Sequence, residues 1–119
     1  MYYVHVLKMN ILFSDVSDLQ VQSILLKAGD NRTISCSGVN EHSLILTLEW
    51  HSLTNHVKLV EYMSDVITVW ANQQRLSLLS DTFGLSFHPV LAEDSGKYIC
   101  LVNSRPKPDG IIRLNVQGK

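Results

Sequence analysis

The sequence predicts an all-β sandwich of two antiparallel sheets, and three observations carry this prediction. Val, Ile, Leu, Ser and Thr recur in short runs, which is typical of strands. Turn signals such as Ala28-Gly29-Asp30-Asn31 and Glu93-Asp94-Ser95-Gly96 separate these runs at short intervals. The length of 119 residues suits one two-sheet domain with a single core.

The alternation of apolar and polar residues indicates about nine strands within residues 19–117. The expected strands span residues 19–27, 32–37, 44–51, 57–63, 66–70, 75–79, 83–87, 97–102 and 111–116. Residues 57–63 and 66–70 are expected to form a hairpin. Residues 1–18 have no clear place in this pattern: they are either additional to the natural domain or an extra edge strand. Polar residues interrupt their apolar run, which disfavours a signal peptide.

The two-residue period of a strand divides the side chains between an inner and an outer face. The expected inner face comprises Ile34, Cys36, Leu46, Leu48, Trp50, Phe83, Leu85, Phe87, Tyr98, Cys100, Ile112, Leu114 and Val116. The residues between them point outward, and Ile99 and Leu101 are apolar residues among these. Two neighbouring apolar side chains on an outer face indicate an interaction patch, although scattered surface apolar residues are also common.

The chain has two cysteines, Cys36 and Cys100, an even number that permits one disulfide. The count alone is equally compatible with two buried thiols. The residues around them are more specific. Trp50 follows Cys36 on a facing strand, and the chain later reads Asp94-x-Gly96-x-Tyr98-x-Cys100.

This constellation resembles the immunoglobulin superfamily over residues 19–117. The resemblance implies a disulfide between Cys36 and Cys100 across the two sheets, with Trp50 packed against it. It also implies that Tyr98 forms a tyrosine corner and that Gly96 allows a tight turn. In variable-type members an arginine pairs with the aspartate of this motif, so we expect a salt bridge between Arg75 and Asp94.

The length of chain between the cysteines favours the nine-stranded variable type, because residues 57–70 can supply the two added strands. Antibody domains carry a glycine bulge in the last strand, where this chain has Asp109-Gly110-Ile111-Ile112-Arg113. The sequence therefore looks more like a non-rearranging cell-surface receptor, adhesion or costimulatory and butyrophilin-like protein than like an antibody.

The resemblance implies that a protein partner binds the outer face of the sheet containing residues 44–51, 57–63, 97–102 and 111–116. The candidate contact residues on this face and on the basic, proline-containing loop at 103–109 are Glu49, His51, Tyr62, Ile99, Leu101, Arg105 and Lys107. The partner is expected to be another immunoglobulin-type domain, either a different protein or a second copy of this one.

The remaining features argue against other functions. A net charge of −1 gives no bulk attraction to nucleic acid. The five histidines are scattered, and no nucleophile elbow or phosphate loop occurs, so we expect no metal, cofactor or enzymatic activity. A disulfide requires an oxidising compartment, and Asn31-Arg32-Thr33 is a glycosylation sequon. We therefore expect an extracellular or secreted module, with any membrane anchor outside this sequence. A spacer module of an intracellular or matrix protein and a soluble innate recognition domain are the alternatives.

Overall fold

A computed structural model describes residues 19–40, 42–70 and 74–118. The strands within them are β1 (Val21–Lys27), β2 (Arg32–Ile34), β3 (Thr47–Ser52), β4 (Val57–Met63), β5 (Val66–Val69), β6 (Leu76–Leu78), β7 (Leu85–Phe87), β8 (Gly96–Val102) and β9 (Ile111–Gln117), with a short 3₁₀ turn, η2, at Ala92–Asp94. The predicted all-β class is confirmed. The interpretation of residues 1–18 lies outside the described residues.

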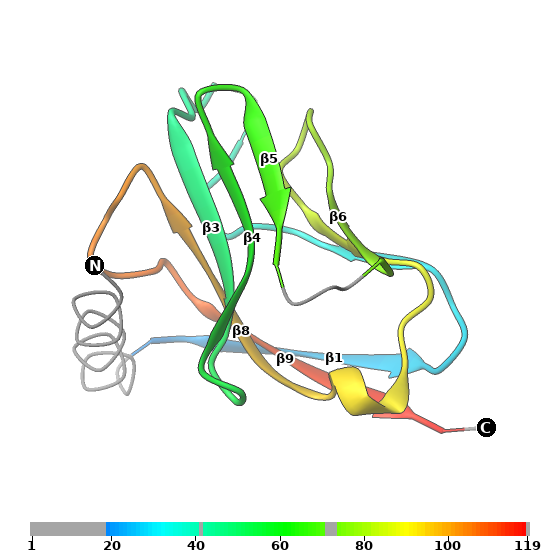
Figure 1. The fold of residues 1–119 in the computed structure, drawn as a ribbon. Helices are drawn as coiled ribbons and strands as arrows, with labels where there is room; N and C mark the ends of the chain where they lie inside the picture. The colour runs from blue at the N-terminus through cyan, green and yellow to red at the C-terminus, as the bar shows by residue number, and fades with distance from the viewer. Residues whose placement is uncertain (1–18, 41, 71–73, 119) are drawn as a thin grey trace.

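The strands form two sheets that face one another (Figure 1). The six-stranded sheet has the order β1-β9-β8-β3-β4-β5, and the three-stranded sheet has the order β2-β7-β6. Neighbouring strands pair antiparallel except β1, which lies parallel to β9. The predicted hairpin is present, because β4 and β5 pair through a two-residue turn. Both turn residues, Ser64 and Asp65, have positive φ, the backbone shape that suits the twist of a hairpin.

The core between the sheets contains most of the predicted inner face. Trp50, Leu48 and Leu85 are fully buried, and Phe83 and Val116 pack against the core from its margin. Trp50 Nε1 donates a hydrogen bond to the carbonyl oxygen of Phe83 at 3.0 Å, so the indole is satisfied within the core. The placement of Leu46 on the inner face is wrong: β3 begins only at Thr47, and Leu46 is 62% exposed.

Cys36 and Cys100 form a disulfide across the two sheets, with their Cα atoms 5.5 Å apart. The adjacent tyrosine corner is also present, because the Tyr98 hydroxyl donates a hydrogen bond to the carbonyl oxygen of Asp94 at 2.5 Å. Burial raises the pKa of Tyr98 above its usual value, and the nearby Asp94 acts in the same direction. Gly96 has φ of +146°, and a Cβ there would lie 2.7 Å from Thr54 Oγ1, so this position requires glycine.

Arg75 and Asp94 lie at the other margin of the core, before β6 and at the end of η2. Arg75 Nη1 donates to Asp94 Oδ2 at 2.8 Å, and Nη2 donates to Oδ1 at 3.1 Å. Arg75 Nη1 also donates to the carbonyl oxygen of Pro89 at 2.9 Å, and Asp94 accepts the Leu91 N–H at 2.7 Å. This bidentate pair joins the segment before β6 to the turn that leads into β8.

Candidate functional site

The outer face of the six-stranded sheet differs from the expectation at its apolar centre. Ile99 and Leu101 do point away from the main core, but they are only 1% and 6% exposed. They pack with Leu53 and Ile111 in a second buried cluster, to which Leu19 adds a partly buried contact. Their assignment as an exposed partner-binding patch is therefore wrong. Replacing Ile99 with aspartate would place a charge in a packed cluster rather than test a binding surface.

The structure also places two other predicted contact residues on this sheet, His51 and Tyr62. His51 is fully buried, with its Nε2 atom 2.8 Å from Glu49 Oε1. Tyr62 packs its ring against Phe83, with the ring centroids 5.0 Å apart, on the core side of β4. The Tyr62 hydroxyl donates to Asp65 Oδ1 at 2.8 Å, and this hydrogen bond raises the pKa of Tyr62. His51 is thus covered on the outer face, whereas Tyr62 is half-buried with an exposed hydroxyl.

The accessible part of the outer face is charged and internally paired. Glu49 on β3 and Glu61 on β4 flank Lys58, whose Nζ lies 3.8 Å from Glu49 Oε1 and 3.3 Å from Glu61 Oε1. The same ammonium group lies 4.9 Å from the ring centroid of Trp70, in cation–π contact. A partner that meets this area would encounter fixed charges of both signs, which orient a complex more than they anchor it.

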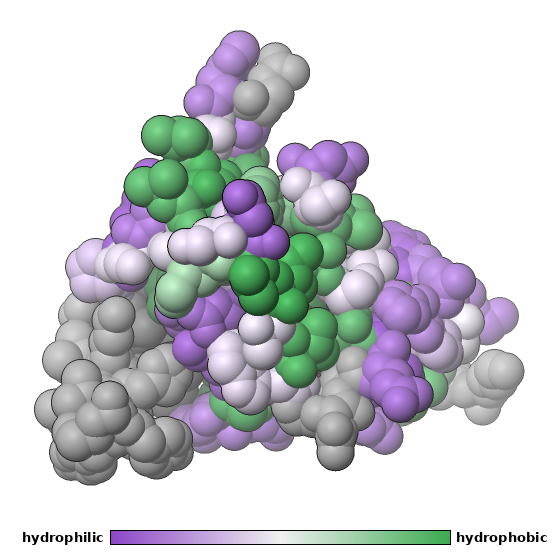
Figure 2. All heavy atoms as spheres, turned by 45° about the horizontal axis from the view of Figure 1, so that its top comes forward, coloured by the Kyte–Doolittle hydropathy of each residue, from purple (hydrophilic) through white to green (hydrophobic). Residues whose placement is uncertain are grey.

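A more exposed apolar surface lies at the end of the sandwich where β3 begins and β4 turns into β5. Leu44 is 75% exposed and Leu46 62%, and Met63 and Val66 are exposed beside them, since Thr47 pairs with Met63 and Met63 with Val66. We call Leu44, Leu46, Met63 and Val66 the loop-end apolar surface. Figure 2 brings this end of the molecule forward and shows hydrophobic areas gathered there among polar ones.

Asn103, which was not among the predicted site residues, holds this surface in place. Its Oδ1 atom accepts the backbone N–H groups of Leu46 and Thr47 at 2.7 Å and 3.1 Å. Its Nδ2 atom donates to the carbonyl oxygen of Leu44 at 2.8 Å. Asn103 directly follows β8 and has φ of +53°, a conformation that asparagine tolerates. One amide therefore fixes residues 44–47 against the loop between β8 and β9.

The loop between β8 and β9, residues 103–110, carries the two predicted basic residues next to this surface. Arg105 and Lys107 are exposed, whereas Pro108 is buried and anchors the loop. Arg105 Nη1 donates to Asp109 Oδ2 at 3.4 Å, and Ser104 Oγ lies 3.4 Å from Thr47 Oγ1. The second contact ties the start of the loop to β3, and the first joins two residues of the loop to each other.

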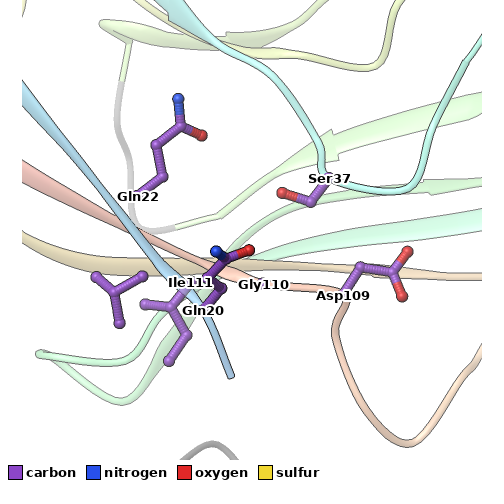
Figure 3. Close-up of a pocket in the computed structure, with 7 residues that line it drawn as sticks. Gln20, Gln22, Ser37, Asp109, Gly110 and Ile111 are labelled. Carbon is purple, nitrogen blue, oxygen red and sulfur yellow. The ribbon is translucent and has the colours of Figure 1, made fainter. Parts of the chain in front are cut away.

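A cleft of about 400 Å³ lies at the neck of the same loop. Its lining residues come from three segments, the start of β1, the chain after β2 and the start of β9, as Figure 3 shows. The lining residues are Gln20, Val21, Gln22, Ser37, Asp109, Gly110 and Ile111. Its lining offers amide, hydroxyl and carboxylate groups. Gly38 has φ of +89°, a backbone conformation that favours glycine, and the Asp109 carboxylate occupies the space that a Cβ there would need.

Residues 19–40, 42–70 and 74–118 contain no group of three or more His, Cys, Asp or Glu side chains arranged to hold a metal ion. Within the same ranges, no helix has the length and apolar character needed to cross a membrane. Asn31 is exposed and lies just before β2.

The two sheets, their disulfide, the tyrosine corner and the β4–β5 hairpin define an immunoglobulin-like domain of the variable type. No protein-family model matches the chain. The chain is 38% identical over 103 residues to a protein named as the receptor-type tyrosine-protein phosphatase mosPTP-1 of Aedes aegypti. This match covers 87% of the chain and 8% of that protein, so the likeness concerns one segment of a much longer molecule.

Solved structures share the fold at low sequence identity. The first Ig-like domain of human CD48 antigen has a TM-score of 0.69 at 20% identity, covering 86% of each chain. The extracellular domain of the voltage-gated sodium channel beta4 subunit, described as a parallel homodimer, has a TM-score of 0.64 at 18% identity and covers 88% of this chain and 92% of that one. Dpr11 IG1, described as bound to DIP-gamma, has a TM-score of 0.61 at 21% identity and covers 81% of this chain and 98% of that one.

Proposed function

We propose that this domain is an extracellular protein-recognition module that binds another immunoglobulin-like domain through its loop end and the adjoining charged sheet face. The observation that carries the proposal is the Asn103 amide, which holds the exposed Leu44 and Leu46 beside the basic loop at 103–110. Exposed leucines held in one conformation offer apolar area to a partner with little loss of chain entropy.

The neighbouring charges favour recognition of a protein surface. Arg105 and Lys107 are exposed on one side of the loop-end apolar surface, and the Glu49–Lys58–Glu61 network lies further along β3 and β4. An apolar centre bordered by charges of both signs matches the organisation of protein interfaces. The described similarity to proteins that assemble through such domains, as homodimers or as heteromeric complexes, supports an immunoglobulin-like partner.

The disulfide supports an extracellular or secreted location, because such bonds persist in oxidising compartments. The likeness to a receptor-type protein and to an extracellular channel-subunit domain points in the same direction. A binding role requires no catalytic group, and we propose none for this domain.

The test is a binding screen of the oxidised domain against purified immunoglobulin-like ectodomains, with the domain itself included. For any partner found, we expect the double variant Leu44→Asp, Leu46→Asp to weaken binding at least about tenfold, since apolar contact is replaced by desolvated charge. Leu25→Asp is the matched control, because Leu25 is 69% exposed on β1, at the opposite edge of the same sheet.

A variant that removes the amide but keeps both leucines sharpens this test. Asn103→Ala removes the hydrogen bonds to residues 44–47 while leaving Leu44 and Leu46 present. We expect this variant to weaken partner binding as well, by lowering the association rate constant, because residues 44–47 must then be ordered during binding. A partner that binds the double leucine variant as tightly as the unmodified domain, with melting temperatures unchanged, would refute the proposed surface.

A further inference from the structure

The edge strand β5 has the properties of a pairing site. It ends the six-stranded sheet in the order β1-β9-β8-β3-β4-β5, and no strand in the described ranges pairs with its far side. All four of its residues, Val66-Ile67-Thr68-Val69, are exposed, and three of them are β-branched aliphatic side chains. Natural sheets usually protect such an edge with lysine, proline or a bulge, none of which occurs within β5. Figure 1 shows β5 on the outer side of β4.

The register between β4 and β5 identifies the backbone groups that face outward. Val60 pairs with Val69 and Met63 with Val66, and the Trp70 N–H donates to the Leu59 carbonyl oxygen at 2.8 Å. Hydrogen-bonded and non-hydrogen-bonded pairs alternate along an antiparallel ladder. Val66, Thr68 and Trp70 therefore direct their backbone groups toward β4, while Ile67 and Val69 direct theirs to the free edge.

We propose that two copies of this domain associate by antiparallel pairing of β5 with β5, continuing the six-stranded sheet across a two-fold axis at Thr68. In this register Ile67 of each copy lies opposite Val69 of the other, and the two residues exchange backbone hydrogen bonds. Thr68 lies opposite its own copy in a non-hydrogen-bonded pair, and Val66 lies opposite Trp70. Cross-strand pairs of β-branched and aromatic residues are favourable.

Charge repulsion disfavours the parallel arrangement. Asp65 precedes the strand, and Lys58 lies over Trp70 at its other end, with its Nζ 4.9 Å from the ring centroid. Lys58 is already paired with Glu49 and Glu61, so it adds no net positive charge there. Parallel pairing would bring the two Asp65 carboxylates together, whereas antiparallel pairing keeps them at opposite ends of the paired strands. The pairing uses the β5 edge of each copy, so the assembly closes at two.

Concentration-dependent sedimentation of the oxidised domain tests the proposal. We expect a monomer–dimer equilibrium for the unmodified chain. Ile67→Pro removes an outward N–H from each copy, and with it two of the four cross-edge hydrogen bonds, while keeping the hydrogen bonds to β4. Thr68→Lys places two ammonium groups against each other at the axis. Each variant should weaken the dimer at least about tenfold without lowering the melting temperature appreciably.

Cross-linking gives an independent measure of the register. Opposing Cα atoms in a non-hydrogen-bonded pair are about 4.5 Å apart, within disulfide range, so Thr68→Cys should oxidise to a covalent dimer. Leu25→Cys on β1 is the control and should stay monomeric in the same oxidant. Leu44→Asp with Leu46→Asp should leave the β5 dimer intact, which separates this inference from the proposed partner surface.

Several results would overturn the proposal. A chain that stays monomeric at every concentration, or a Thr68→Cys variant that oxidises no faster than Leu25→Cys, excludes the pairing. A dimer that tolerates both Ile67→Pro and Thr68→Lys uses another surface. Open-ended oligomers also contradict the proposal, because a shared β5 edge leaves no second copy of that edge to extend the assembly.

Discussion

Removal of the Arg75–Asp94 pair should destabilise the domain by an amount between that of a surface ion pair and that of a buried one. The side chains of Arg75 and Asp94 are 20% and 10% exposed, and two hydrogen bonds join them. Exposed pairs contribute about 0–1 kcal/mol, and breaking a fully buried pair costs about 3–5 kcal/mol. We therefore expect Arg75→Met to lower the free energy of unfolding by about 2 kcal/mol.

Part of this loss comes from Asp94, because its carboxylate would keep the Leu91 N–H as a donor but lose the guanidinium. Asp94→Asn should cost a similar amount, and the double variant should cost less than the sum of the two single variants. A coupling free energy of about 1–2 kcal/mol is expected from the cycle. For a domain of this size, the single variants correspond to a fall in melting temperature of roughly 10 °C.

Urea unfolding followed by tryptophan fluorescence provides the assay. The slope of the free energy of unfolding against urea concentration is compared among the variants. Arg113→Met is the matched control, since Arg113 is exposed on β9, and it should change stability by less than about 0.5 kcal/mol. The experiment is repeated in about 1 M salt, which screens exposed charges more than partly buried ones. A coupling free energy below about 0.5 kcal/mol, or one abolished by salt, would refute the reasoning.

Three further predictions concern the disulfide, the tyrosine corner and the sequon. Reduction of the Cys36–Cys100 bond, which spans a sequence separation of 64, should lower the free energy of unfolding by roughly 4 kcal/mol in urea titrations, and a loss below about 1 kcal/mol would contradict this. Folding raises the pKa of Tyr98, so the contribution of this residue to the free energy of unfolding is complete below about pH 10 and declines as the pH rises further. Tyr98→Phe should flatten this decline in urea titrations, and an unchanged alkaline slope would contradict the prediction. Expression through a eukaryotic secretory pathway should add a glycosidase-sensitive mass that Asn31→Gln removes, and a persistent mass would exclude Asn31 as its site.

The strand pattern and the core could be predicted because they depend on local rules. Alternation of side chains identified the inner positions around Trp50 and Leu85, and the spacing of Asp94, Gly96 and Tyr98 located the turn into β8. Those rules act within one strand or one turn. They do not require knowledge of which distant segments cover a surface, so they succeed wherever burial follows directly from strand period.

The candidate site could be predicted only in part, because it depends on contacts between distant segments. Strand period correctly gives the direction of Ile99 and Leu101, but both are buried in a second apolar cluster with Leu53 and Ile111. The prediction for the start of β3 was wrong for a similar reason. Asn103 accepts the N–H groups of Leu46 and Thr47, some 56 to 57 residues earlier in the chain. An asparagine directly after a strand was the available local signal for such a turn.

The same packing that stabilises the sandwich also determines what it can present to a partner. The antiparallel ladder between β3 and β8 pairs Leu48 with Val102, so Asn103, directly after β8, meets residues 44–47 at the start of β3. Leu44 and Leu46 stay exposed because their backbone groups are satisfied by that amide rather than by a neighbouring strand. β5, in contrast, owes its exposure to its place at the end of the sheet order. The first surface depends on side-chain hydrogen bonds and the second on free backbone groups, so substitutions at Asn103 and at Ile67 should affect them independently.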